Sequence, residues 1–232
     1  YPDYSAGSQM LSDLSFYLSK NGFDAAVVTS RRMYDDSGKP LLTHEEFNGV
    51  DVHRVWSSRF GRKSYIGRII DYISLEVSLI IKLFNIIKKG DIVVLMTDPP
   101  LLNVISYPLI KFKRGVVVNW LHDLFPEVAV SAGVFAKTSL INRLITKLRN
   151  QVIKGADKNV VIGSKMYSYL VDIGVNNEKI TKIENWSDGS AIYSIENKDN
   201  CIRNDWGLED KFVVGYSGNL GRAHDISTIL TV

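Results

Sequence analysis

Short apolar runs alternate with longer amphipathic segments along most of this 232-residue chain, and this alternation restricts the fold more than any other feature. The runs at 91–96, 116–121 and 158–162 are rich in valine, and their length suits buried strands. The segments at 65–89 and 139–154 carry apolar residues at helical spacing. Strands of this kind separated by helices are typical of a parallel sheet with helices on both faces. The sequence therefore predicts an α/β fold with a Rossmann-like parallel sheet.

Turn and cap residues predict the remaining elements. Asn48 and Gly49 both tolerate positive φ angles, so we expect a hairpin over 46–55. Ser164 is expected to cap a helix that ends at Gly174. The other predicted elements are a helix over 10–18 that stops at Gly22, a strand over 23–29, a helix over 101–111 and a strand over 179–183.

The character of the chain changes after Asp188. Residues 189–208 are mostly polar and irregular, which predicts a linker. Residues 209–232 contain an apolar run at 212–216 followed by glycines, and we interpret them as the beginning of a second Rossmann-like domain. The N-terminal domain is expected to cover 1–188. We expect its first strand to precede Tyr1, and the second domain to continue past Val232.

The composition excludes several classes of protein. The one cysteine leaves no internal disulfide and no multi-cysteine metal site, which suits a reducing cytoplasm. The net charge of +3 is too small to argue for nucleic-acid binding, and no nucleic-acid recognition motif is present. The apolar stretch 66–87 contains four charged residues, so we expect that it does not span a membrane.

Polar side chains follow two of the predicted strands, at the sheet edge where ligands of parallel α/β proteins bind. Asp98 lies in a loop with two prolines after the strand at 91–96, and we expect it to contact a substrate hydroxyl. A rigid connector is the alternative, because prolines stiffen a loop. His122 and Asp123 follow the strand at 116–121. An imidazole there can donate to a sugar hydroxyl, and a structural histidine is the alternative. A Ser-His-Asp triad is unsupported because the chain has no Gly-x-Ser-x-Gly motif.

Two turns rich in small residues are candidates for anion binding. Glycines let the backbone approach a pyrophosphate, and the amides at a helix N-terminus point toward the anion. Ala6 and Gly7 precede the first predicted helix, where the alternative is a simple helix cap by Ser8. The second candidate turn, for which a plain turn is the alternative, contains Gly218, Asn219, Leu220, Gly221 and Arg222.

Basic residues cluster near 54–68 and 137–158. Solvated helix faces are one interpretation of such clusters. Peripheral contact with anionic lipid is the other.

Several motifs together resemble family 4 of the retaining glycosyltransferases, which have the GT-B fold of two facing Rossmann-like domains. The likeness extends to bacterial enzymes of capsule, colanic acid and O-antigen assembly, and it covers nearly the whole chain. The matching segments are Tyr1-Pro2-Asp3 with Gly7, Asp98-Pro99-Pro100, the run 122–127 (HDLFPE), the run 185–188 (NWSD) and the run 216–225 (YSGNLGRAHD).

The resemblance implies a role for each candidate residue. Ala6, Gly7 and Asp98 would bind the acceptor, with Gly7 also near the departing phosphate. His122 would contact the transferred sugar as the catalytic residue, and the 218–222 loop would hold the donor pyrophosphate. No metal and no other cofactor is expected, because helix dipoles and basic side chains would stabilise the leaving diphosphate.

The resemblance also implies the partners of the protein. These are a nucleotide-sugar donor and a lipid-linked sugar acceptor in cell-surface polysaccharide synthesis, at the cytoplasmic face of the plasma membrane. The family's glutamate pair would lie beyond Val232, so these 232 residues alone are not expected to turn over substrate. A GT-B-like sugar-nucleotide epimerase and a non-catalytic binding domain are the alternatives.

Overall fold

The structure is a computed structural model that describes residues 1–33, 41–60, 65–131, 133, 136, 139–187, 189, 193–196 and 200–216, with Tyr65 described by its backbone alone. The chain divides into two compact units, Tyr1–Asn185 and Trp186–Val232.

A three-stranded sheet forms the beginning of the first unit. Its order is β1 (Ala25–Ser30), β3 (Val50–Val55) and β2 (His44–Phe47), with β1 parallel and β2 antiparallel to β3. Asn48 and Gly49 join β2 to β3 with φ angles of 51° and 73°. The hairpin predicted around these two residues is therefore confirmed.

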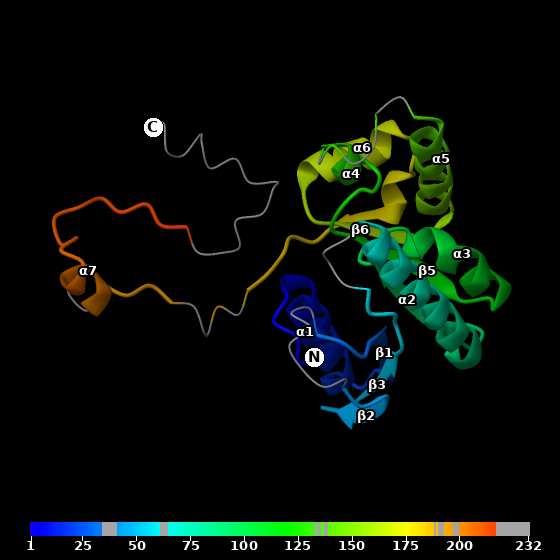
Figure 1. Ribbon diagram of the computed structural model, residues 1–232, viewed down its shortest axis with the longest axis horizontal. Coiled ribbons are helices and arrows are strands. Elements are labelled where there is room, and N and C mark those ends of the chain that lie inside the picture. The colour runs from blue at the N-terminus through cyan, green and yellow to red at the C-terminus, as the bar shows by residue number, and fades with distance from the viewer. Residues whose placement is uncertain are drawn as a thin grey trace. The chain divides into compact units, whose positions relative to one another are not determined.

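A four-stranded sheet that contains β5 (Val116–Leu121) and β6 (Lys158–Val161) follows in the same unit (Figure 1). All of its strands are parallel. Parallel neighbours need crossover connections, and helices supply them here. The strands, in sheet order, are β4 (Ile92–Met96), β5, β6 and β7 (Ile180–Lys182). The helical connections are α3 (Leu102–Phe112), then α4 (Glu127–Ser131) with α5 (Leu140–Gly155), then α6 (Ser164–Asp172) with the short 3₁₀ turn η1 (Asn177–Lys179).

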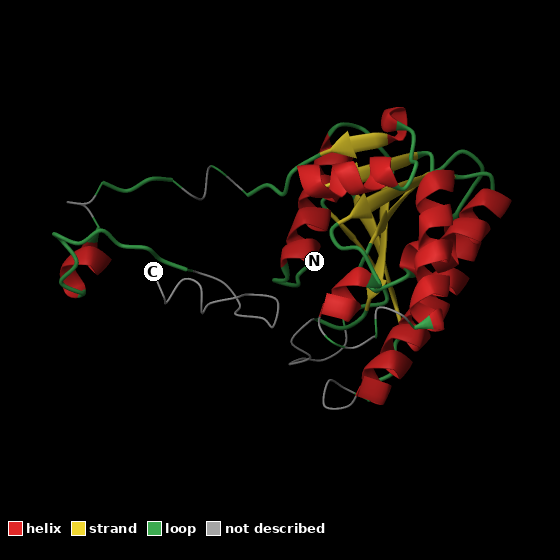
Figure 2. Cartoon of the chain, turned by 90° about the horizontal axis from the view of Figure 1, so that it is seen from above, coloured by secondary structure: helices red, strands yellow, loops and turns green. Residues whose placement is uncertain are grey.

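Helices lie on both sides of the strands (Figure 2). α2 (Tyr65–Ile86) packs against α3, which packs in turn against α5, while α1 (Ala6–Lys20) packs on β1 and β3. One buried cluster fills the space between α2, α3 and the start of the parallel sheet: Leu83, Ile87, Leu95, Ile110, Val117 and Ala156. A second lies toward α6 and β7: Leu121, Ile153, Val161, Leu170, Val175 and Ile180.

The expected α/β class with a Rossmann-like parallel sheet is confirmed. The long helix expected over 65–89 and the strands expected in the first unit all form, with ends that shift by a few residues. One cap assignment is wrong: Ser164 is the first residue of α6, whose N-cap is Gly163. The expectation that Ala6 and Gly7 precede the first helix is also wrong, because α1 begins at Ala6 with Ser5 as its N-cap, and Ser8, the alternative cap, lies inside the helix.

The second unit differs from the sequence prediction in two places. The strand expected at 212–216 does not form, and Phe212 is 96% exposed. An apolar run becomes a strand only when another strand pairs with it, and the described residues provide no such partner. The expected linker contains a short helix, α7 (Cys201–Asp205). Its Arg203 guanidinium donates to the carbonyl oxygens of Leu208 at 2.6 Å and Lys211 at 2.7 Å, which closes the turn after the helix.

Among the described residues, no helix combines the length and the apolarity that a bilayer-spanning segment requires. The expectation that 66–87 does not span a membrane agrees with this finding. α2 holds most of that stretch and packs against β1, β3 and α3.

Candidate functional site

A pocket of about 330 Å³ lies at the carboxyl ends of β4 and β5, within the first unit. This is the sheet edge at which parallel α/β proteins bind ligands. Its lining comes from the start of α1, the ends of β4 and β5, the loops that follow them, the beginnings of α3 and α4, and one residue from the second half of α5. The lining residues include Gly7, Thr97, Asp98, His122, Asp123 and Arg149.

Strand pairing brings the two loops together. Met96 at the end of β4 is paired with Trp120 in β5, so both strands reach the same edge of the sheet at the same height. The Thr97 hydroxyl then accepts hydrogen bonds from two backbone amides, that of His122 at 3.3 Å and that of Asp123 at 3.2 Å. The His122 loop is therefore fixed against the Asp98 loop by one side chain.

The His122 imidazole is partly buried in this pocket. Its ring lies 4.8 Å from the Trp120 ring, centroid to centroid. Burial lowers its pKa, and the nearby Asp123 carboxylate opposes that shift. Its Nε2 atom is buried and has no hydrogen-bond partner among the residues that the structure describes. A neutral imidazole with an unused nitrogen can exchange a hydrogen bond with a ligand hydroxyl.

Asp98 lines the pocket and is an exposed residue. Desolvation by the surrounding protein raises the pKa of its carboxyl group, and the charge of Asp123 raises this pKa further. An ionised carboxylate accepts hydrogen bonds, and a protonated one can also donate a hydrogen bond. Asp98 is thus suited to contact a hydroxyl-rich ligand.

Gly7 lines the pocket from the first turn of α1. The first amides of a helix have no partner within the helix and carry partial positive charge. The first turn of α1 holds no acidic residue that would cancel this charge. A Cβ on Gly7 would lie 3.6 Å from Cε of Met96, which is ordinary contact, so packing alone does not require glycine here.

Arg149 is a pocket residue that sequence reasoning missed. Its side chain is 3% exposed, and its guanidinium donates to Glu127 at 3.0 and 2.6 Å and to the Tyr169 hydroxyl at 2.8 Å. The sequence placed it only within a basic stretch. The sequence did contain one indication of this pair. Glu127 is the last residue of the 122–127 motif, and an acidic residue there could have suggested a basic partner.

The candidate residues from the sequence separate into three groups. Gly7, Asp98 and His122 line one pocket, although they are far apart in the chain. Ala6 begins α1 beside Gly7 but is not among the residues that line the pocket. The remaining candidates, which are Gly218, Asn219, Leu220, Gly221 and Arg222, lie outside the described residues.

Known proteins resemble this chain in sequence and in fold. No family model matches it. A probable glycosyltransferase of Pseudomonas aeruginosa, WbjE, is 32% identical over 152 residues, which are 65% of this chain and 38% of WbjE. The crystal structure of Anabaena Alr3699/HepE, in complex with UDP and glucose, matches with a TM-score of 0.56 and 16% identity, over 95% of this chain and 52% of HepE.

The two comparisons have different scope. At 16% identity, the likeness to HepE shows a common fold. The chain spans 38% of the length of WbjE and 52% of HepE, so each relative extends well beyond the part compared. The chain is therefore an α/β protein with the fold of about half of HepE and with sequence similarity to a probable glycosyltransferase.

Proposed function

We propose that the intact protein is a glycosyltransferase that moves a sugar from a nucleotide-sugar donor to an acceptor. The observation that carries this proposal is the convergence of Gly7, Asp98 and His122 on one pocket at the strand ends. The similarity to WbjE supports the same reaction class. UDP and glucose in the HepE complex support a nucleotide-sugar donor.

Each pocket residue has a role in this proposal. The neutral His122 imidazole donates a hydrogen bond to a hydroxyl of the transferred sugar, which positions the anomeric carbon. Asp98 and the Ala6-Gly7 turn bind the acceptor. The partial positive charge at the start of α1 stabilises the departing phosphate. Gly218, Asn219, Leu220, Gly221 and Arg222 hold the donor pyrophosphate, and transfer proceeds without a metal and with retention of configuration.

The acceptor in this proposal is a lipid-linked sugar in cell-surface polysaccharide synthesis, reached from the cytoplasmic face of the membrane. α5 supports this, because one of its faces exposes large apolar side chains beside basic ones. The apolar residues are Leu140, Ile141, Leu144 and Leu148, and the exposed basic ones include Arg143 and Lys147. Such a helix can lie in the interface of an anionic membrane.

A donor screen with the intact protein tests the reaction. We expect release of nucleoside diphosphate that requires both a nucleotide sugar and a lipid-linked acceptor, with mass spectrometry showing an acceptor longer by one sugar. NMR of the product should show the anomeric configuration of the donor. Rearranged donor without lengthened acceptor would instead indicate an epimerase, and no turnover of any nucleotide sugar would contradict the proposal.

Vesicle pelleting tests the membrane contact. We expect the intact protein to sediment with anionic vesicles and to be released at high salt, because salt screens exposed charges. The triple variant Leu140→Ser, Ile141→Ser and Leu144→Ser should bind the vesicles at least about tenfold more weakly. It removes apolar area that would enter the membrane interface. The matched control is Val171→Ser, which changes an exposed apolar residue on α6. Equal binding of the triple variant and the control would remove α5 from the contact.

A further inference from the structure

The β2–β3 hairpin gathers histidine and acidic side chains on one of its faces. In the antiparallel register His44 lies opposite His53, and Glu46 lies opposite Asp51. Side chains two residues apart on a strand point to the same face, and directly opposed residues of an antiparallel pair share a face. These four residues therefore form a single patch. The opposite face of β3 carries Val50 and Val52, which are buried.

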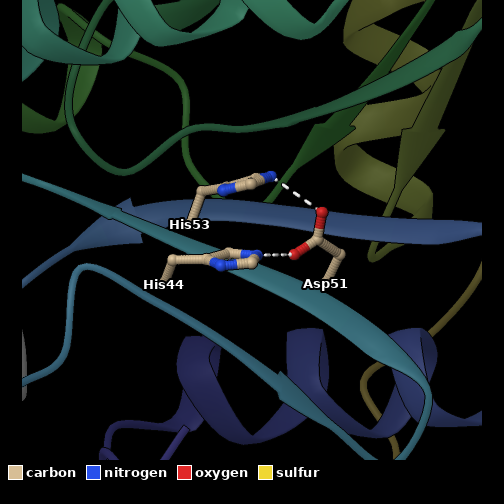
Figure 3. A group of neighbouring side chains, drawn as sticks. All are labelled: His44, Asp51 and His53. Atoms are coloured by element: carbon tan, nitrogen blue, oxygen red, sulfur yellow. Dashed lines mark hydrogen bonds and ion pairs between the residues drawn. The ribbon is translucent and has the colours of Figure 1, made fainter.

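The Asp51 carboxylate bridges the two imidazoles from one side, facing the ring edge of each, as Figure 3 shows. One of its oxygens contacts Nε2 of His44, and the other lies 2.9 Å from Nε2 of His53. The rings of His44 and His53 stack with centroids 4.8 Å apart and planes 16° from parallel. Both histidines thus present the same nitrogen toward the same carboxylate.

We propose that His44, Asp51 and His53 bind one divalent transition-metal ion of the Zn²⁺ type. One ligand atom from each side chain lies within 4.8 Å of the other two, so modest side-chain rotations would bring all three to roughly 2.0–2.2 Å from a common ion. Two imidazoles and one carboxylate form a donor set that suits Zn²⁺ better than Mg²⁺ or Ca²⁺, which prefer oxygen ligands.

The charges around the patch favour a cation between the carboxylates. Asp51 and Glu46 are directly opposed across the hairpin, and like charges in that position destabilise a sheet. The two histidines offset this only when they are protonated. A bound metal ion supplies the missing positive charge and takes up neutral imidazoles directly.

Exposure leaves one side of the ion open to solvent. The side chain of His53 is 13% exposed, whereas those of His44 and Asp51 are 59% and 44% exposed. The ion would enter from the His44 side and keep water in its remaining positions. None of the three ligands lines the pocket that contains His122. The ion therefore links β2 to β3 and takes no part in sugar transfer.

Zinc titration of the full, tag-free chain after chelator treatment tests the site. Calorimetry should give one Zn²⁺ per chain, with binding that millimolar Mg²⁺ does not displace. Removal of one ligand should weaken binding about 100-fold or more, and the two variants to measure are His44→Gln and Asp51→Asn. His122→Gln is the matched control, because it removes a histidine outside the cluster and should bind Zn²⁺ like the unchanged chain.

Thermal unfolding separates loss of the site from loss of the fold. His44 is exposed, and an exposed ion pair contributes little to stability, so His44→Gln should unfold near the temperature of the unchanged chain when no metal is present. Zn²⁺ should then raise the midpoint of the unchanged chain and leave that of His44→Gln in place. The proposal is overturned if Zn²⁺ does not bind stoichiometrically, or if His44→Gln binds it as tightly as the unchanged chain. Either result leaves the glycosyltransferase proposal unaffected.

Discussion

Histidine and aspartate residues are neighbours in two regions of the first unit, and their geometry differs between the two. On the hairpin, Asp51 contacts both His44 and His53 through its two oxygens. In the pocket, Asp123 follows His122 in the chain and acts on its pKa through charge, while Nε2 of His122 stays buried without a described partner. Burial lowers the pKa of both His53 and His122. Adjacency of the two residue types in a sequence therefore does not decide their chemistry.

The backbone explains the difference. Residues 122 and 123 are consecutive in a loop, where no strand register fixes the relative direction of their side chains. Asp51 and His53 are two apart on one strand, and His44 faces His53 across the hairpin, so all three project from the same face. The loop leaves its imidazole available to a ligand, whereas the hairpin directs its imidazoles toward a shared carboxylate.

The largest effect that this comparison predicts is on catalysis by the intact protein. His122→Ala should lower the rate of nucleoside diphosphate release about 100-fold, because it removes a positioned hydrogen-bond donor from a partly buried site. His122→Gln should recover part of the loss, since an amide can also donate.

Kinetics and thermal unfolding measured together check this prediction. The control is Ser168→Ala, an exposed position on α6 that should keep full activity. His122→Ala should unfold near the temperature of the unchanged protein. Full activity in His122→Ala would show that the imidazole has only a structural role. The proposed functional difference between His122 and the hairpin histidines would then be wrong.

The strands and long helices were predictable because their apolar periodicity is local. Val116–Leu121 was located from sequence with the bounds it has in the structure. The pocket was predictable in part, since parallel strands end at the same edge and Asp98 and His122 each follow a strand.

Contacts between distant segments explain what the sequence did not show. Arg149 pairs with Glu127 across 22 residues, and no periodicity marks that pair. The hairpin cluster was missed because the hairpin was derived from Asn48-Gly49 alone and was expected to begin at residue 46, which left out His44. The alternation of His44 with Glu46, and of Asp51 with His53, was the indication available once the register was known.

A second prediction concerns the ion pair beside the pocket and should be smaller. Glu127→Gln should lower the free energy of unfolding by about 2 kcal/mol, because it leaves the buried Arg149 charge without its carboxylate. Arg149→Met should cost only about 1 kcal/mol, since methionine fills similar space and the side chain of Glu127, 42% exposed, can be solvated. Urea denaturation of both variants measures the difference. Equal losses would mean that Arg149 is better solvated than its 3% exposure indicates.

The smallest predicted effect concerns an acidic residue on α2, the helix that packs against β1 and β3. Glu76 on α2 is buried, it has no ion pair among the described residues, and burial raises its pKa to about 7. The unfolded chain ionises this group near its ordinary pKa of 4.5, so the folded state loses stability as the pH rises from 4.5 to 7 and carries the full cost above 7. Glu76→Gln should therefore raise the free energy of unfolding by about 1 kcal/mol at pH 8 and leave it nearly unchanged at pH 4.5. Urea denaturation at the two pH values measures this. If Glu76→Gln raised the free energy of unfolding equally at both pH values, the amide would stabilise the fold by packing and not by removing a buried charge. Glu76 would then not differ from the paired Glu127 in its dependence on pH.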